Sequence, residues 1–167
     1  MLFRSNKVLV AAAAIVCLVI AAAVFMLRPE GHLVIRDAET GETYISYPLE
    51  RGEEFSITFI HSVNKTPVTD VYDVDERGII MLRKTIYYGF GAGVPSDLDP
   101  KMELTYEEGT GAMVVSKIDM ELPSFYLFVG TVSDHTLSIG GEEISLRDVC
   151  GRNTKVHISY ENSRIFP

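Results

Sequence analysis

An unbroken apolar run divides this chain of 167 residues into unequal parts. Val8 to Leu27 are twenty consecutive apolar residues, and Arg4 and Lys7 precede them without any acidic residue. Twenty helical residues at about 1.5 Å each extend roughly 30 Å, which is the thickness of a bilayer's hydrocarbon core. We therefore expect a head over residues 1–7, a transmembrane anchor over 8–27, a linker over 28–31 and a folded domain over 32–167.

The charges beside the apolar run predict its orientation. Short basic flanks stay on the cytoplasmic side of a membrane, so Arg4 and Lys7 place the head inside the cell. We thus expect a single-pass protein of the cell membrane with an extracytoplasmic C-terminal domain. The alternative is a signal peptide cleaved near Ala21–Ala23, which would release a secreted domain. Val24–Leu27 continue the apolar run past that site and favour the anchor.

The folded domain is acidic. Together with the end of the linker, it forms residues 29–167, which contain 12 basic residues and all 23 acidic residues, a net charge of about −11. Binding of nucleic acid requires a clustered Lys/Arg surface, so the composition excludes nucleic acid as a partner. An anionic ligand would need a local positive site, and no motif in the sequence indicates a cofactor.

The domain is rich in β-branched and aromatic residues, which favour pleated strands over helices. Short segments alternate with turn signals, among them the two-residue hairpin signal Gly140–Gly141. We predict an all-β, antiparallel β-sandwich or barrel-like domain, with a single helical turn near Arg147–Cys150. The expected strands are His32–Arg36, Glu42–Tyr47, Glu53–Ser62, Val68–Asp75, Ile79–Tyr88, Met102–Tyr106, Ala112–Lys117, Phe125–Gly130, His135–Ile139, Glu142–Leu146 and Lys155–Tyr160.

One predicted strand carries a histidine on its apolar face. Alternate residues from Phe55 to His61 share that face, because side chains in a strand repeat every two residues. A turn over residues 63–68 would set His61 opposite Asp70 at the rim of the core. There the carboxylate could orient the imidazole. The alternative is that His61 only hydrogen-bonds to hold the turn.

A second motif holds three alternating glycines, Gly89, Gly91 and Gly93, before Pro95. Glycine permits positive φ and lets another group approach the backbone closely. Such a loop either packs against the sheet or faces a ligand, whose negative charge its backbone N–H groups could bind. The lysine-terminated phosphate-loop pattern is absent, which argues against a nucleotide.

Together the two motifs resemble a known bacterial family. Phe59–Val68 followed by Asp70, and then Gly89–Pro95, are similar to the domain of unknown function numbered 1850, over about His32–Tyr160. The family has no established activity, and Asp70 stands where it leads us to expect glutamate. The resemblance implies an exported or membrane-anchored protein, often encoded beside TRAP transporters of the TAXI type.

We therefore expect a non-enzymatic accessory domain that assists a transporter with a small organic anion. The resemblance implies a TRAP-TAXI permease or solute-binding subunit as partner, and a dicarboxylate or amino acid as the kind of anion. The predicted ligand-binding residues are His61, Ser62, Lys65, Asp70, Gly89, Gly91 and Gly93.

Two other functions use some of the same residues. Hydrolysis would need Ser62 as nucleophile, His61 as base and Asp70 as orienting acid. Neighbouring strand residues point to opposite faces, so we expect His61 and Ser62 to point apart. Metal binding would add Asp73 and Asp75, which alternate onto the face opposite Asp70 and suit a solvated acidic surface. The sequence therefore predicts neither catalytic residues nor metal ligands.

Overall fold

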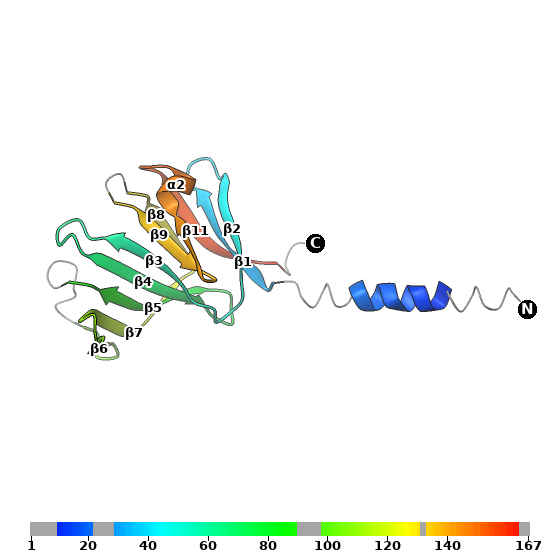
Figure 1. The fold of residues 1–167 in the computed structure, drawn as a ribbon, viewed down its shortest axis with the longest axis horizontal. Helices are drawn as coiled ribbons and strands as arrows, with labels where there is room; N and C mark the ends of the chain where they lie inside the picture. Colours follow the sequence, from blue (N-terminus) through cyan, green and yellow to red (C-terminus); the bar gives the residue numbers. More distant parts are fainter. Residues whose placement is uncertain (1–9, 22–28, 90–97, 131–132, 164–167) are drawn as a thin grey trace, which may run out of the picture.

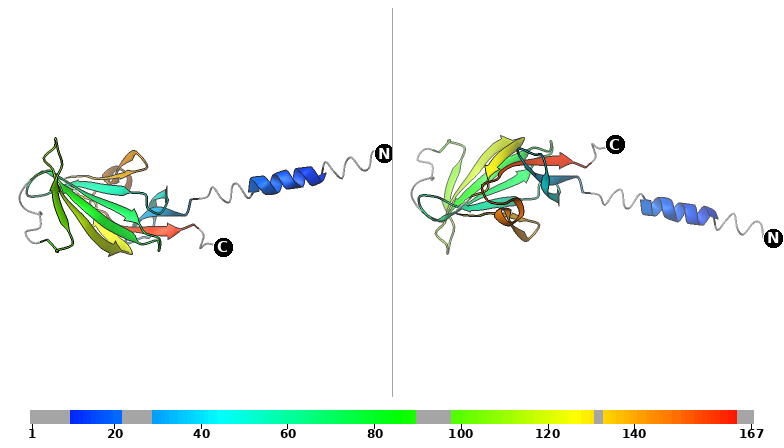
Figure 2. Two further views of the ribbon diagram at one scale, coloured as in Figure 1. Left: turned by 90° about the horizontal axis from the view of Figure 1, so that it is seen from below. Right: turned by 90° about the horizontal axis from the view of Figure 1, so that it is seen from above.

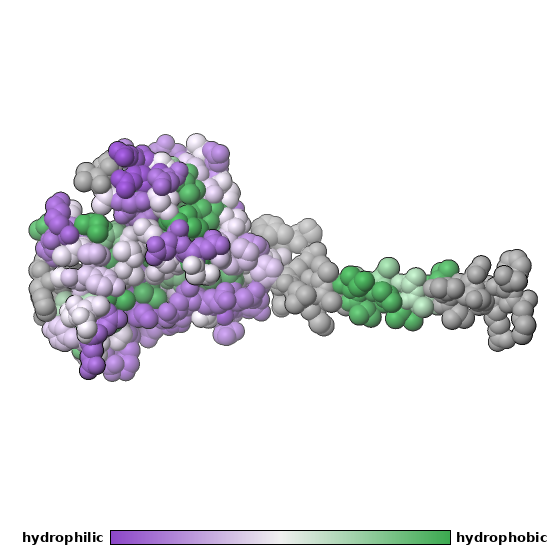
Figure 3. Space-filling model, viewed as in Figure 1, coloured by the Kyte–Doolittle hydropathy of each residue, from purple (hydrophilic) through white to green (hydrophobic). Residues whose placement is uncertain are grey.

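The computed structural model describes residues 10–21, 29–89, 98–130 and 133–163, which form an N-terminal helix and a β domain (Figure 1). The helix spans residues 10–21 and its surface is hydrophobic, whereas the visible face of the β domain is mostly hydrophilic (Figure 3). Among the described residues, no helix is both long and apolar enough to span a bilayer.

The described part of the β domain contains eleven strands and one short helix, and each strand overlaps a segment predicted from the sequence. The single-turn helix α2 (Leu146–Cys150) is also confirmed. The strands are β1 (Gly31–Asp37), β2 (Thr43–Leu49), β3 (Phe55–Ile60), β4 (Pro67–Val74), β5 (Ile80–Tyr87), β6 (Glu103–Tyr106), β7 (Met113–Leu122), β8 (Ser124–Phe128), β9 (His135–Ile139), β10 (Glu142–Ser145) and β11 (Lys155–Asn162).

These strands form two antiparallel sheets, which confirms the predicted all-β class (Figures 1 and 2). One sheet has the order β2-β1-β11-β8, and the other has the order β10-β9-β3-β4-β5-β7-β6. β1 pairs with β11 so that Gly31 lies opposite Asn162. The ends of the β domain therefore lie together, whereas the β3–β4 turn lies at its far end (Figure 1).

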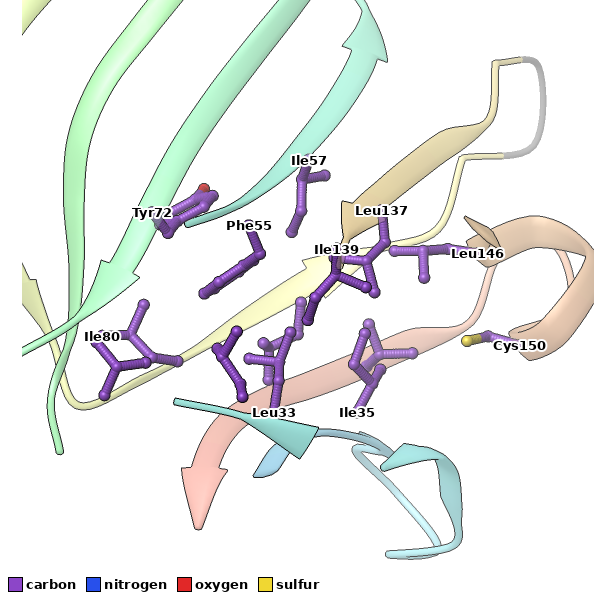
Figure 4. Packing of buried hydrophobic residues seen from close by; sticks show 14 of the residues in the cluster. Leu33, Ile35, Phe55, Ile57, Tyr72, Ile80, Leu137, Ile139, Leu146 and Cys150 are labelled. Atoms are coloured by element: carbon purple, nitrogen blue, oxygen red, sulfur yellow. The ribbon is translucent and has the colours of Figure 1, made fainter. Parts of the chain in front are cut away.

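A single apolar core joins the inner faces of the two sheets (Figure 4). Phe55 on β3 is 1 % exposed, and its ring stacks on Tyr72 of β4 at 5.1 Å between centroids. Tyr72 stacks in turn on Phe125 of β8, at 5.3 Å, across the gap between the sheets. Leu146 and Cys150 of α2 close one side of the core (Figure 4).

The predicted hairpin signal and the short helix have the expected local geometry. Gly140 and Gly141 form the two-residue turn between β9 and β10, with φ of 57° and 82°, which glycine adopts at low cost. At α2, Ser145 is the N-cap and its hydroxyl accepts a hydrogen bond from the Asp148 N–H. Cys150 is a free, buried thiol, and burial raises its pKa to about 11.

Candidate functional site

The turn that carries the predicted site lies two residues earlier in the chain than the sequence suggested. β3 ends at Ile60, the His61 N–H donates to the Thr66 carbonyl at 2.9 Å, and the Lys65 N–H donates to the His61 carbonyl at 2.9 Å. Lys65 adopts a left-handed φ of 57°. The strands therefore pair Ile60 with Pro67, and the expected turn over residues 63–68 is wrong.

The expected pairing of His61 with Asp70 is wrong for the same reason, because Asp70 lies opposite Ile57. The observed and the expected registers of the two strands differ by an even number of residues, so Asp70 still shares the inner face with Ile57 and Tyr72. The Thr85 hydroxyl of β5 donates to Asp70 at 2.6 Å, and the Tyr72 hydroxyl lies 3.5 Å away, a weak contact. No described Lys or Arg forms an ion pair with Asp70.

This environment changes the acidity of Asp70. Burial raises the pKa of the Asp70 carboxyl, and the hydrogen bonds from Thr85 and Tyr72 oppose that rise. Burial and the nearby Asp70 charge also raise the pKa of Tyr87, two residues along β5 from Thr85. Asp70 is thus a partly buried carboxyl group among hydroxyl groups, away from His61.

The two sequence motifs meet at the β3–β4 turn. Tyr88 N–H donates to the Pro67 carbonyl at 3.1 Å. Gly89 lies so close to Thr66 that a Cβ atom at position 89 would be 2.6 Å from the Thr66 methyl carbon. The start of the glycine motif therefore packs directly against the residue that pairs with His61. Gly91 and Gly93 lie outside the described residues.

A third segment, between β8 and β9, packs against the same turn. The His135 ring stacks on Phe59 at 5.6 Å, and the Ser133 hydroxyl lies 3.5 Å from the Ile60 carbonyl. The Gly130 N–H donates to His135 Nδ1 at 3.3 Å, which leaves the ring proton of the neutral form on Nε2. Burial lowers the pKa of His135, although the Asp134 charge opposes this, so the neutral form is favoured.

A small hollow of about 190 Å³ lies between these segments. It brings together three of the predicted residues, His61, Ser62 and Lys65, and adds Ile60 and Ser133. His61 and Ser62 both line this hollow, whereas we expected their side chains to point to opposite faces of a strand. That expectation treated Ser62 as a strand residue, but Ser62 lies in the turn.

The hollow does not have the arrangement of a hydrolytic triad. His61 Nδ1 accepts a hydrogen bond from the Val63 N–H at 3.3 Å, whereas a triad histidine donates from this nitrogen to a carboxylate. Within the described residues no hydrogen bond joins Ser62 to His61, and Asp70 contacts Thr85 instead. The described residues also contain no cluster of three His, Cys, Asp or Glu side chains that could hold a metal ion.

The segments around the hollow are unusually poor in acidic residues. Among the described residues, no Asp or Glu occurs in 55–69, 80–89 or 122–130. Lys65 is exposed, and it forms no ion pair with another described residue. Asp134, at the end of the segment between β8 and β9, already accepts hydrogen bonds from the Ser145 hydroxyl and from the backbone N–H groups of His135 and Arg147. The hollow therefore offers an anion the cationic side chain of Lys65 beside three further polar residues, His61, Ser62 and Ser133.

The comparisons with known proteins identify a family for this region. A family profile described as "Domain of unknown function (DUF1850)" matches residues 55–146, more than half of the chain. The chain belongs to the DUF1850 family. Neither the curated proteins nor the solved structures gave a match. The DUF1850 segment runs from β3 into α2, so it includes both the β3–β4 turn and the segment between β8 and β9 that line the hollow.

Within the DUF1850 segment, substitution of Asp70 tests whether burial, and not pairing with an opposite charge, dominates the pKa of its carboxyl group. The pKa of Asp70 in the folded state is raised above 3.8, its value in the unfolded chain. The free energy of unfolding should therefore fall as the pH rises through the folded-state pKa of Asp70. Asp70→Asn should therefore raise the free energy of unfolding at pH 7 and change it little at pH 3. Urea unfolding of the full chain in detergent micelles, followed by circular dichroism at both values, measures the difference.

Asp75→Asn is the matched control for this prediction, with the opposite sign. Hydrogen bonds, first from the Ile79 N–H and then from Arg77, hold the pKa of Asp75 below its usual value. That stabilisation is present above the unfolded pKa and is lost as the pH falls, so Asp75→Asn should destabilise the domain at pH 7. If Asp70→Asn also destabilised it at pH 7, our account of Asp70 would be wrong.

Sequence reasoning missed the side chains that tertiary structure adds to this end of the domain. Thr85 reaches Asp70 from β5, and His135 reaches Phe59 from β9. His135 is separated from Phe59 by more than seventy residues, so only the order of strands in the sheet brings them together. The alternation of β9 placed His135 on the same face as buried Leu137, which was the available signal.

Proposed function

We propose that this DUF1850 protein is a membrane-anchored extracytoplasmic accessory domain that assists a TRAP-TAXI-type transporter with a small organic anion. In this proposal the hollow beside the β3–β4 turn receives a carboxylate group of the anion. Lys65 supplies the positive charge, and His61 and Ser62 supply hydrogen-bond donors. The observation that carries the proposal is the exposed Lys65 in an acid-free turn, beside the glycine motif, on a domain with a net charge of about −11.

The proposed location rests on the sequence of the N-terminal part. Residues 8–27 are apolar, and the basic residues Arg4 and Lys7 precede them. An anchor with this charge distribution leaves the β domain on the outer side of the membrane. A tethered domain there would meet solute-binding proteins as they dock on a permease. This arrangement suits an accessory role, in which the domain shares the anion or the docking surface with transporter subunits.

A binding role also fits the chemistry of the hollow better than hydrolysis does. A serine nucleophile needs a base that accepts its proton and a group that orients the base. In the described residues His61 is oriented by the Val63 N–H, and no carboxylate is hydrogen-bonded to its ring. Hydrogen bonds and charge attraction from His61, Ser62 and Lys65 need no such relay, so the same residues can hold an anion without transforming it.

Charge reversal at Lys65 tests the proposal. The full chain in detergent micelles should bind succinate or glutamate in calorimetry. Lys65→Glu should weaken this binding about 10- to 100-fold, which corresponds to the usual free energy of one charged hydrogen bond. Binding should also weaken with added salt, which screens the attraction. When the chain is co-expressed with the TRAP-TAXI permease, wild type should retain the permease on affinity purification.

Lys101→Glu is the control, because it makes the same change of charge at another exposed lysine, outside the hollow. It should leave both the affinity for the anion and the retention of the permease close to wild type. The proposal fails if wild type binds neither carboxylate and does not retain the permease. It fails equally if Lys65→Glu and Lys101→Glu have the same effect.

A further inference from the structure

Two aromatic side chains are exposed on the outer face of the four-stranded sheet. Tyr126 is 60 % exposed and Phe128 is 61 % exposed, and both belong to β8. They are two residues apart, so they project from the same face, while Phe125 and Leu127 project into the core. Large exposed aromatic residues side by side are typical of interaction surfaces.

β8 is also the edge strand of its sheet, because β11 is its only partner among the described strands. Just beyond β8, the Val129 N–H donates to Thr154 and the Val129 carbonyl accepts from Asn153, both at 2.9 Å. Backbone groups alternate in direction along an antiparallel strand. Those of Tyr126 and Phe128 therefore point to the open edge, where another extended segment can pair with them.

Positive charge accompanies this edge. The Lys155 ammonium lies 4.6 Å from the centre of the Tyr126 ring, and the His157 ring lies 4.9 Å from it. Lys155 forms no ion pair with a described residue. In the next strand Arg36 is paired with Glu161, so that acidic residue is already neutralised. The edge of β8 is thus aromatic and cationic, on a domain whose net charge is about −11.

We propose that the open edge of β8 binds an extended acidic segment of a partner protein, which adds a fifth strand to the four-stranded sheet. Backbone hydrogen bonds to Tyr126 and Phe128 supply the pairing, and apolar side chains of the segment cover the two rings. Its carboxylates lie against Lys155 and His157. This interaction does not depend on anion binding in the hollow beside the β3–β4 turn.

The position of the edge favours a protein over a lipid surface or a second copy of this chain. β11 pairs Lys155 with Phe128 at one end and Asn162 with Gly31 at the other. Seven residues at about 3.3 Å each separate these ends by roughly 23 Å, so the aromatic edge lies far from where the N-terminal segment enters the domain. Two copies with a charge of about −11 each repel one another, whereas an acidic segment of another protein meets a locally positive edge.

Site-specific photocrosslinking in cells tests this proposal. Benzoylphenylalanine in place of Phe128 in the full chain should form adducts, and mass spectrometry should map them to an acid-rich segment of one other protein. The same residue in place of Met120, which is 49 % exposed on β7 of the other sheet, should not form these adducts. Lys155→Glu should lower the yield at position 128 about tenfold, whereas Lys101→Glu should leave it unchanged.

Circular dichroism of Lys155→Glu confirms that the β domain remains folded, so that a lower yield reports on charge at the edge. The proposal is overturned if the adducts map to a second copy of this chain, to lipid, or to a segment without excess acidic residues. It is also overturned if position 128 gives no more adduct than position 120, or if Lys155→Glu leaves the yield unchanged.

Discussion

Replacing Phe55 with alanine should unfold most of the chain's β structure under conditions in which the wild-type domain is stable. Phe55 is 1 % exposed, and its ring lies between the inner face of β3 and the stacked Tyr72. Truncation of a buried phenylalanine costs about 3–5 kcal/mol, because it removes apolar contacts and leaves a cavity. Domains of this size are stable by only about 5–15 kcal/mol. Urea unfolding of the full chain in detergent micelles, followed by circular dichroism, measures the loss.

Phe128→Ala is the matched control, since it makes the same truncation at a side chain that is 61 % exposed. We expect it to change the free energy of unfolding by no more than about 0.5 kcal/mol. The stack of Tyr72 between Phe55 and Phe125 should be lost only in Phe55→Ala. Equal losses in the two variants would contradict the position of the core between the sheets.

The strands were predictable from the sequence because each carries its own local signal. In β3, buried Phe55 and Ile57 alternate with less buried residues, and turn residues bound most segments. The shortness of α2 was predictable because no stretch of the domain sustains an apolar period of 3.6 residues over three turns. The order of the strands in the two sheets was not predictable, because it depends on contacts between segments that are distant in sequence.

The pairing of β3 with β4 was predicted incorrectly because it depends on one unusual backbone conformation. Lys65 adopts a left-handed φ of 57°, which residues with a Cβ rarely do, within a turn that lies two residues earlier than expected. Pro67 then becomes the first residue of β4, a position that proline tolerates. An apolar pattern leaves the register of two strands free to shift by an even number of residues, because such a shift keeps every side chain on its face. The predicted faces of β3 and β4 were therefore right, whereas the predicted partner of Asp70 was wrong.

The candidate site was predictable in part. His61, Ser62 and Lys65 do line one hollow, and Gly89 packs against Thr66 of the same turn, because the two motifs flank neighbouring strands. Asp70 was placed too close to His61, and the contribution of Ser133 from the β8–β9 segment had no local signal. The aromatic edge of β8 was missed because alternation shows which residues share a face, but not that the strand lies at the edge of its sheet.

Gly140→Ala should produce the second large loss of stability, through the contact between the two sheets. Gly140 has a φ of 57°, and a Cβ atom there would lie 2.2 Å from the Tyr47 hydroxyl of β2. Left-handed backbone costs an alanine about 1–2 kcal/mol, and forcing Tyr47 aside adds about 1–3 kcal/mol. We therefore expect a total loss of about 2–5 kcal/mol in the same urea unfolding measurement.

The neighbouring glycine supplies a control within the same turn. Gly141 has a φ of 82°, but a Cβ atom there would meet nothing within 4 Å, so Gly141→Ala should cost only the backbone strain of about 1–2 kcal/mol. Adding Tyr47→Leu to Gly140→Ala removes the obstructing ring. The double variant should then be more stable than the sum of the two single losses predicts, because the collision exists only when both side chains are present. Strictly additive losses would show that the β9–β10 turn does not press against β2, and that the two sheets meet differently at this end.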